Sequence, residues 1–501
     1  MPKFLLLSAL ALALAGCGGG ATQTAPTLRT DAEGDLRYGQ LRFKPCSLGE
    51  EGTAAIEAQC ATLKAPENHD APKGRTIDLA VALIPAKNAT QPDPLVILAG
   101  GPGQAILDAY PGLHDALEDV RRSRNILLMD ARGTGGSHLL ECDELGELMD
   151  GSATEPDAAQ MRGLAERCRG RLSKTSDLRY YTTTDHIRDL DLLRRTVGVD
   201  KLNLVGISYG TRVAQQFAKR YPAHTRTVTL DSIAPNTLVL GQEHARNLDA
   251  ALKQQFARCA ADPACKRNIG DPVAMLATVR ATLQAGGIAP VRYRDPTSGE
   301  WREEAPAFGH LSALLRFYAY RPESASMLPL VLHDASKGRY EPLLSQARSL
   351  AGDLGDSMAL GMHLSVSCTE DPEIRIDPAD KDTILGTSMA EFLQAQCAAW
   401  PKGARPADFR TPLSGNVPVL AISGEFDPVT PPRYGDEVVK TLPNGRHLVL
   451  PGQGHSVLTT GCMPKLFAQF VEKADAKALD AGCLKRLKAS PPFAGYYGWE
   501  P

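Results

Sequence analysis

The sequence has few of the features that mark nucleic-acid-binding, metal-binding or membrane-spanning proteins. Its 501 residues carry a formal net charge of −3, and the basic residues are scattered, which argues against a nucleic-acid partner. No two cysteines have the Cys-x-x-Cys spacing of a zinc site. The apolar run at residues 4–15 is too short for a stable membrane span. We therefore expect no metal and no cofactor. The sequence also has no internal repeat of a fixed period.

The N-terminus has a recognisable export pattern. Lys3 precedes the apolar run, which ends in Leu-Ala-Gly-Cys at residues 14–17. This pattern resembles a bacterial lipoprotein signal, in which cleavage before Cys17 leaves that cysteine lipidated. An ordinary signal peptide is the alternative, because Ala-x-Ala-like residues are also present. We expect residues 1–17 to be the signal and residues 18–35 to be a flexible tether.

This reading predicts a location as well. The mature chain would be lipid-anchored in a bacterial cell envelope, with the membrane as a partner through the lipid. Gly18 is compatible with sorting to the outer membrane of a Gram-negative host, facing the periplasm or the exterior.

The cysteine count agrees with export. Eleven cysteines are present, and without Cys17 the number is even, as expected for disulfides in an oxidising compartment. Pairing each cysteine with its neighbour would give Cys46–Cys60, Cys142–Cys168, Cys259–Cys265, Cys368–Cys397 and Cys462–Cys483. The sequence alone does not fix this connectivity.

The most informative stretch is Gly-Ile-Ser-Tyr-Gly at residues 206–210. It follows an apolar run at 202–205 that predicts a buried strand, and it precedes a helical pattern at 211–221. Strand, Gly-x-Ser-x-Gly and helix form the nucleophile elbow of an α/β hydrolase. The glycines allow a turn so tight that Ser208 is strained and its hydroxyl is exposed. A chance match among 45 glycines is the alternative, and the flanking elements favour the elbow.

The acid and the base of such a site should follow the serine in that order. An apolar strand pattern at residues 417–427 ends in Asp427. A second strand pattern at 448–450 leads through a glycine-lined loop to His455, and residues 433–441 between the two look helical. Ser208 would attack, His455 would take its proton, and Asp427 would orient the imidazole.

Three weaker alternatives stay open for the acid and the base. Asp427 is favoured because it stands at a strand end before a proline-rich loop. The alternatives are His447 at the start of its strand, Glu425 just before Asp427, and Asp231 at the end of the apolar segment 228–230.

A glycine loop upstream could supply an oxyanion hole. The apolar run 95–98 predicts a strand, and Ala-Gly-Gly-Pro-Gly-Gln follows at 99–104. We expect the backbone N–H groups of Gly101 and Tyr209 to be the donors. A phosphate loop is the rival, but the Gly-Lys-Ser/Thr ending is missing. After the next strand, Asp130 and Arg132 are expected to brace a structural turn near the site.

Five motifs then occur in the order and spacing of one family. They are Gly-Gly-Pro-Gly at 100–103, Asp-Ala-Arg-Gly-Thr-Gly at 130–135, Gly-Ile-Ser-Tyr-Gly-Thr at 206–211, Gly-Glu-Phe-Asp-Pro-Val-Thr-Pro at 424–431 and Gly-Gln-Gly-His at 452–455. Together they resemble the proline iminopeptidase and tripeptidyl aminopeptidase family of α/β-hydrolase serine peptidases, over about residues 40–485.

The resemblance is closer to one branch of that family. The last two motifs are similar to the C-terminal region of the tripeptidyl branch. Ala99 stands where the iminopeptidase branch usually carries histidine, and this departure favours the tripeptidyl branch. The resemblance implies a triad of Ser208, Asp427 and His455, in agreement with the reading of the residues themselves.

The chain is long for a hydrolase core alone. The segment between the elbow and the acid exceeds what two strand–helix units require. We expect a mainly helical cap at 236–400, with helical patterns at 244–256 and 307–320 and a hairpin at 291–304. The core, a mostly parallel, doubly wound α/β sheet, would comprise residues 36–235 and 401–501.

An aminopeptidase must hold a positively charged α-amine, and carboxylates at the end of a cleft would do so. Glu370 and Asp371 follow an apolar segment beside Cys368, where the cap rejoins the core. We predict that they bind the amine. The alternative is a solvated acidic turn before Pro372.

These observations predict a serine aminopeptidase that releases residues or short peptides through an acyl-enzyme. A carboxylic ester hydrolase with the same triad is the first alternative, and an inactive binding lipoprotein is the second. The complete set of expected active-site residues argues against the second. Peptides are the expected substrates, and the sequence does not indicate an oligomeric state.

Overall fold

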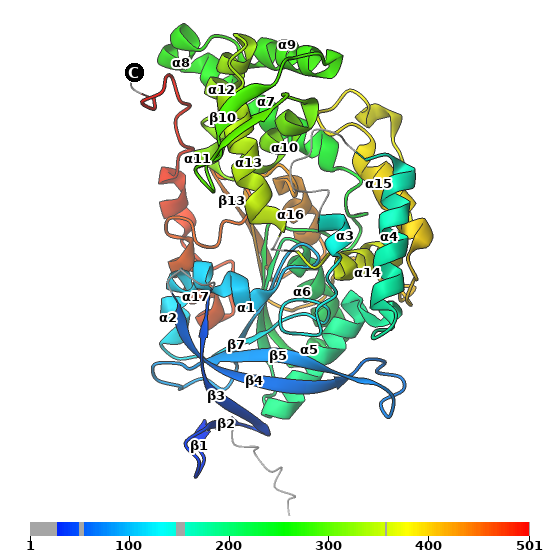
Figure 1. The fold of residues 1–501 in the computed structure, drawn as a ribbon. Helices are drawn as coiled ribbons and strands as arrows, with labels where there is room; N and C mark the ends of the chain where they lie inside the picture. Colours follow the sequence, from blue (N-terminus) through cyan, green and yellow to red (C-terminus); the bar gives the residue numbers. More distant parts are fainter. Residues whose placement is uncertain (1–27, 50–54, 147–155, 356–357, 500–501) are drawn as a thin grey trace, which may run out of the picture.

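The computed structural model describes residues 28–49, 55–146, 156–355 and 358–499. The predicted signal with Cys17 lies outside the described residues, as does most of the predicted tether. The described chain forms one large sheet with helices on both faces and a mainly helical region at one end (Figure 1). No helix in these four segments is both long and apolar enough to cross a membrane.

The sheet has 11 strands in the order β1-β2-β3-β4-β5-β7-β6-β8-β9-β12-β13. Its antiparallel part is β1 (Arg29–Thr30), β2 (Leu36–Tyr38), β3 (Leu41–Leu48), β4 (Ile56–Pro66) and β5 (Thr76–Ile84). Its parallel part is β7 (Ile126–Met129), β6 (Leu95–Leu98), β8 (Leu202–Ile207), β9 (Thr225–Asp231), β12 (Val419–Gly424) and β13 (Gly445–Leu450). The predicted strands of the core are therefore confirmed.

The parallel strands are buried on both faces, which explains their continuous apolar sequences. Val96 and Leu98 pack into one core cluster, whereas Leu95 and Ile97 pack into another, because successive side chains point to opposite faces. The first cluster is covered by α5 (Thr183–Val197), α6 (Tyr209–Arg220) and α16 (Pro432–Val439), and the second by α1 (Ile106–Ala109), α2 (Glu118–Arg121) and α17 (Met463–Lys473). Figure 1 shows α5 and α6 on one side and α1, α2 and α17 on the other.

The segment between β9 and β12 is mainly helical, as predicted. It contains α7 (His244–Ala261), α8 (Pro263–Asn268), α9 (Pro272–Ala285), α10 (Phe308–Tyr318), α11 (Pro322–Ala325), α12 (Leu328–Ser336), α13 (Glu341–Gly355), α14 (Leu360–Glu370), η5 (Pro378–Asp380) and α15 (Ser388–Ala399). The predicted hairpin is present as β10 (Val291–Arg294) and β11 (Trp301–Glu304).

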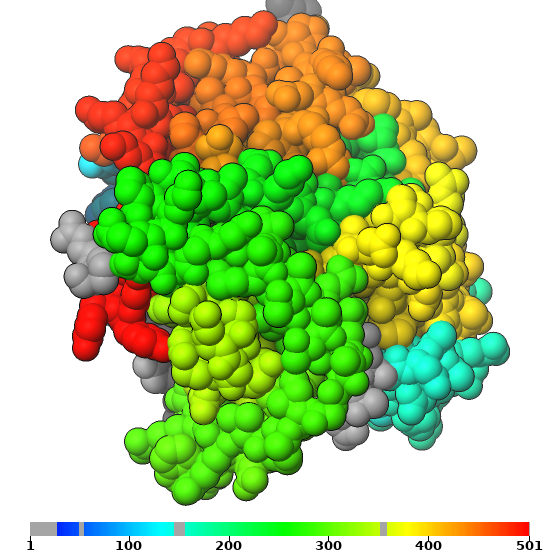
Figure 2. Space-filling view, turned by 90° about the horizontal axis from the view of Figure 1, so that it is seen from above, coloured from blue at the N-terminus to red at the C-terminus, as the bar shows by residue number. Residues whose placement is uncertain are grey.

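Part of this inserted region has a core of its own. Side chains of α7, α9, α10, α12 and α13 form an apolar cluster that is separate from the two clusters of the sheet. Seen from above, the green inserted segment covers much of the face between the orange C-terminal part and the yellow segment (Figure 2). The exact limits predicted for the cap and for the two parts of the core stay predictions.

The remaining helices are short or flank the core. They are α3 (Asp143–Gly146), α4 (Ala158–Leu172), η1 (Tyr110–Leu113), η2 (Asp115–Leu117), η3 (Leu178–Tyr180), η4 (Pro222–His224) and η6 (Ala481–Arg486).

Among the described residues, disulfides close five short loops, and all five are the neighbour pairs predicted from the sequence. They are Cys46–Cys60, Cys142–Cys168, Cys259–Cys265, Cys368–Cys397 and Cys462–Cys483. Such cross-links stabilise a fold mainly by restricting the unfolded chain. They favour an oxidising compartment for the folded protein.

Candidate active site

Ser208 lies in the sharp turn between β8 and α6. Its φ and ψ are 56° and −121°, a conformation that is strained for a residue other than glycine. A Cβ on Gly206 would lie 2.3 Å from the carbonyl oxygen of Gly210, and a Cβ on Gly210 would lie 2.1 Å from the carbonyl oxygen of Leu98. Both glycines are therefore required by the turn. The serine side chain makes no cap bond to its helix.

His455 and Asp427 form a closely bonded pair at the ends of β13 and β12. Nδ1 of His455 lies 2.9 and 3.0 Å from the two carboxylate oxygens of Asp427. The Thr430 hydroxyl donates to the same carboxylate at 2.8 Å, and the backbone N–H groups of Val429 and Thr430 donate to it at 2.9 and 2.8 Å. These bonds fix the ring through Nδ1 and leave Nε2 for proton transfer.

The electrostatics of this pair suit a base and its supporting acid. Burial by itself would raise the pKa of Asp427, but the charge and hydrogen bond of His455, with the two backbone N–H donors, lower it to about 2. Burial likewise opposes a charge on His455, and the Asp427 carboxylate nevertheless raises the pKa of the imidazole above its ordinary value. Asp427 is thus ionised at neutral pH and stabilises the imidazolium.

The alternative acids and base have other partners. The Asp231 carboxylate accepts from the backbone N–H groups of Val457 and Leu458 at 2.9 to 3.0 Å, just after His455. Glu425 accepts from the N–H of Gly452 at 2.7 Å, and His447 bonds Asp436 and Ser423. Since the carbonyl oxygen of Asp231 also accepts from the N–H of Ser208 at 2.9 Å, this residue joins the elbow to the histidine loop.

The predicted glycine loop lies against the elbow. A Cβ on Gly100 would be 3.1 Å from the Cβ of Ser208, so the loop and the serine are in direct proximity. Gly101 has a φ of 101°, and the loop is fixed to the inserted region where Ala359 N–H donates to the Gly103 carbonyl at 3.0 Å. The oxyanion roles of Gly101 and Tyr209 stay predictions.

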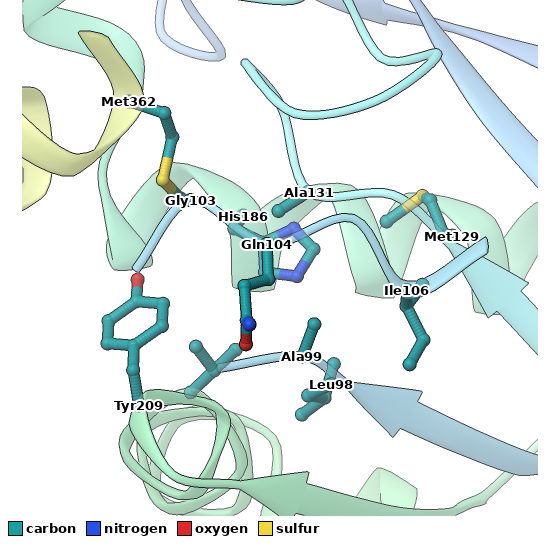
Figure 3. Close-up of a pocket in the computed structure, with 11 residues that line it drawn as sticks. Leu98, Ala99, Gly103, Gln104, Ile106, Met129, Ala131, His186, Tyr209 and Met362 are labelled. Atoms are coloured by element: carbon teal, nitrogen blue, oxygen red, sulfur yellow. The ribbon is translucent and has the colours of Figure 1, made fainter. Parts of the chain in front are cut away.

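A small cavity lies next to this loop, bordered by Gln104, His186, Tyr209 and Met362 (Figure 3). Its volume of about 10 Å³ is close to that of one water position, so it is not a substrate pocket. Burial lowers the pKa of His186 to about 4, and its Nδ1 has no hydrogen-bond partner among the described residues.

The turn after β7 has the bracing role predicted for it. The Asp130 carboxylate accepts from the N–H groups of Leu107 and Gly136 at 2.9 and 3.0 Å. The fully buried Arg132 guanidinium pairs with Asp189 at 2.6 and 2.7 Å. These bonds hold the loops that surround the glycine loop.

Glu370 lies at the C-terminal end of α14, beside the elbow helix. One of its oxygens accepts from the N–H of Thr183 at 2.6 Å and the other from the Thr183 hydroxyl at 2.9 Å. The Thr183 hydroxyl also lies 2.6 Å from the phenol oxygen of Tyr209. A short polar chain therefore leads from Glu370 to the residue that follows Ser208.

Asp371 is differently placed, because both of its oxygens are occupied by arginines. Arg212 donates to one at 2.8 Å and Arg410 donates to the other at 2.9 Å. A carboxylate held by two guanidinium groups has little capacity left for a substrate amine. Amine binding by Glu370 and Asp371 stays a prediction, and the geometry favours Glu370 of the two.

Two contacts at this site were not found from the sequence. Tyr320, just after α10, contacts His455 through its carbonyl oxygen and its ring. Thr430 completes the Asp427 site, and its position three residues after the acid was the only sequence signal for it. For Tyr320 no local pattern gave a signal, since the contact joins distant segments.

Comparisons with known proteins identify the family of the chain. The family model for the alpha/beta hydrolase fold matches residues 93–461. Serine protease Hip1 of Mycobacterium tuberculosis (strain ATCC 25618 / H37Rv) is 26% identical over 504 residues, covering 91% of this chain and 92% of that protein. Tripeptidyl aminopeptidase of Streptomyces coelicolor is 29% identical over 189 residues, covering 35% of each protein.

An esterase and solved structures are also similar to the chain. Carboxylesterase B of Mycobacterium tuberculosis is 26% identical over 478 residues, covering 87% of this chain and 88% of that protein. The crystal structure of proline iminopeptidase from Mycobacterium smegmatis matches with a TM-score of 0.40 and 17% identity, covering 83% of this chain and 99% of that chain. Because the family model spans well over half of its length, the chain belongs to the alpha/beta hydrolase fold family, as a serine hydrolase.

Proposed function

We propose that the chain is an exported serine aminopeptidase that releases residues or short peptides from free peptide N-termini. The observation that supports this most is the bonded pair of His455 and Asp427, whose histidine loop is joined through Asp231 to the strained Ser208 elbow. Relatives that are named serine protease and tripeptidyl aminopeptidase support a peptide as the substrate.

In this proposal the reaction proceeds through an acyl-enzyme. Ser208 Oγ attacks the scissile carbonyl while Nε2 of His455 accepts its proton. The imidazolium, stabilised by Asp427, then donates that proton to the leaving amine. The N–H groups of Gly101 and Tyr209 stabilise the oxyanion, and water activated by His455 releases the acyl group.

The free amine would be bound by Glu370. Burial raises the pKa of this carboxyl to about 7, against the lowering effect of Arg212, so its charge is only partly compensated within the fold. A buried carboxylate whose charge is only partly compensated is stabilised when an ammonium group binds next to it. Hydrogen bonds connect Glu370 through the Thr183 hydroxyl to the phenol of Tyr209, the residue that follows the nucleophile.

A carboxylic ester hydrolase is the second candidate. Carboxylesterase B is similar over nearly the whole chain, and an esterase would use the same three residues. The two functions differ in whether a free substrate amine matters.

The location proposed with this function is the bacterial cell envelope, through a lipid on Cys17. The disulfides support an oxidising compartment. The lipid would hold the chain at the membrane by its tether.

The direct test is labelling and turnover with the purified mature chain. A fluorophosphonate probe should label the parent and leave Ser208→Ala unlabelled. A free tripeptidyl reporter should be cleaved well, and its N-acetylated form poorly. Equal cleavage of both forms would exclude the aminopeptidase and favour the ester hydrolase or an endopeptidase.

A further inference from the structure

The inserted region reaches His455 through the end of α10. The backbone N–H of His455 donates to the carbonyl oxygen of Tyr320 at 2.7 Å. The two rings meet edge to face, with centroids 5.1 Å apart and an interplanar angle of 68°. Tyr320 therefore brings the end of α10 against His455.

Arg316 is one helical turn before Tyr320, and its charge acts on that side chain. Its guanidinium carbon lies 5.1 Å from the ring centroid of Phe317. The side chain is half-buried, and no ion pair joins it to a carboxylate in the segments that the structure describes. The buried Arg132 and Arg212 differ in this respect, since each is paired with an aspartate.

The charge of Arg316 acts on two histidines that lie on other elements. His244 starts α7, and His363 lies in α14. Burial, followed by the charge of Arg316, lowers the pKa of His244 to about 3, and burial also lowers that of His363. Both are neutral at pH 7, so Arg316 supplies the permanent positive charge here.

The acids whose charges act on Tyr320 and on these histidines are already engaged. Asp427, whose charge acts on Tyr320 and His244, is bonded to His455 and Thr430. Asp371, whose charge acts on His363, is bonded to two arginines. A half-buried guanidinium without a carboxylate partner is costly unless an anion or water satisfies it.

We propose that Arg316 is a specificity-determining residue that binds a substrate carboxylate on the leaving-group side of the scissile bond. We assign Arg316 to the leaving-group side because His455, which donates its proton to the leaving amine, is in direct contact with Tyr320. A guanidinium binds a carboxylate through two parallel hydrogen bonds. The inference rests on the proposed peptidase function and narrows its substrates to peptides with a carboxylate close after the cleaved bond.

That carboxylate could be the C-terminus of a short peptide or an acidic side chain. Three matched substrates distinguish the two sources: a short peptide acid, its C-terminal amide, and an amide with glutamate directly after the cleaved bond. The parent should cleave the free acid or the glutamate peptide about 10- to 100-fold better, in kcat/KM, than the neutral amide.

The variant Arg316→Gln should remove that preference, whereas Arg316→Lys should keep part of it as a point charge. Hydrolysis of a small neutral ester should change less than about threefold in both, since this substrate has no carboxylate. The matched control is Arg321→Gln, an exposed arginine on the same segment, which should keep the full preference.

Two further outcomes separate this inference from the proposed function. If the parent cleaves esters but no peptide, the function fails, and Arg316 is then tested by inhibition. In that case N-acetylated peptide acids should inhibit ester hydrolysis by the parent at least about tenfold more strongly than their amides. This difference should disappear in Arg316→Gln. Equal inhibition by acid and amide would overturn the inference. So would an equal loss of ester and peptide turnover in Arg316→Gln, because Arg316 would then only support Tyr320 and His455.

Discussion

The backbone nitrogen of His455 lies 2.7 Å from the carbonyl oxygen of Tyr320, to which it donates a hydrogen bond, so a residue of the inserted region directly supports the candidate base. The approach depends on Gly454, where a Cβ would lie 2.0 Å from that same carbonyl oxygen. The inserted region is consequently part of the site that positions the imidazole. Changes that disturb this contact between Tyr320 and His455 should affect the chemistry as well as substrate selection.

Replacing Ser208 by alanine should abolish hydrolysis of peptides and esters alike. The side chain is the expected nucleophile, and loss of a serine nucleophile costs about 10⁴-fold or more in kcat. Circular dichroism and thermal unfolding should match the parent, because the hydroxyl makes no cap bond to its helix. Turnover above about a hundredth of the parent's would refute the assignment.

Replacing Gly454 by alanine should lower kcat strongly for every substrate. The added Cβ would overlap the Tyr320 carbonyl and force His455 or the end of α10 to move. We expect a loss of at least about 100-fold, because displacements near 1 Å are this costly. Gly309→Ala in α10 is the control, since a Cβ there meets nothing within 4 Å. Similar activities for the two variants would contradict the role of this contact.

The pH profile should report His455. Only the neutral imidazole can accept the Ser208 proton, so kcat/KM should rise with pH as His455 loses its proton. Because Asp427 raises the pKa of His455, the midpoint should lie above the ordinary histidine value of about 6.5. Asp427→Asn should move the midpoint down and reduce kcat by about 10⁴-fold. A parent midpoint below about 6 would disprove the coupling.

The sequence predicted the core strands, the elbow and the disulfide pairs because each has a local signal. The Gly-x-Ser-x-Gly turn needs its glycines next to Ser208, and the cysteine pairs are close along the chain. Asp231 was harder to interpret. Its strand-end position suits a catalytic acid, yet its carboxylate accepts from Val457 and Leu458. Only the fold shows which loop is brought to that strand end.

Contacts of the inserted region could not be predicted for the same physical reason. Arg316 lies on α10 and Tyr320 just after it, and the apolar pattern of this helix describes only its own packing in the cap. That the end of this helix meets His455 depends on how the cap sits on the sheet, and no local pattern specifies this. The same holds for Glu370, whose partner Thr183 is 187 residues away in sequence.

Export can be tested by changing the predicted lipidation site. Cys17→Ser should release the protein from the membrane fraction or block its maturation, because no acyl chain can then be attached. In a Gram-negative host, Gly18→Asp should instead keep the protein at the inner membrane. Fractionation followed by immunoblotting measures both. Unchanged membrane association of Cys17→Ser would refute the lipid anchor.

Glu370→Gln should remove the preference for a free N-terminus. Binding of an ammonium by this carboxylate, as a charge-assisted hydrogen bond, is worth about 1.5–3 kcal/mol, or roughly ten- to hundred-fold in kcat/KM. The variant should therefore cleave free and N-acetylated peptides almost equally, while hydrolysis of a neutral ester stays close to the parent rate. Glu373→Gln is the matched control, because that acid is about half exposed and paired with Arg405 and Arg410.

The pH dependence gives an independent test of Glu370. Burial raises its pKa to about 7, so the carboxylate that the amine requires forms only as the pH rises through that value. KM for a free peptide should fall over this range in the parent and stay flat in Glu370→Gln.

The contribution of Glu370 to the stability of the fold should change in the opposite direction, falling as the pH rises. A folded-state pKa above the unfolded value of about 4.3 means that stability from this group is lost as the pH rises through about 7. Glu370→Gln should therefore be at least as stable as the parent at pH 8, and a large drop in its Tm there would show that Glu370 supports the fold instead of the substrate.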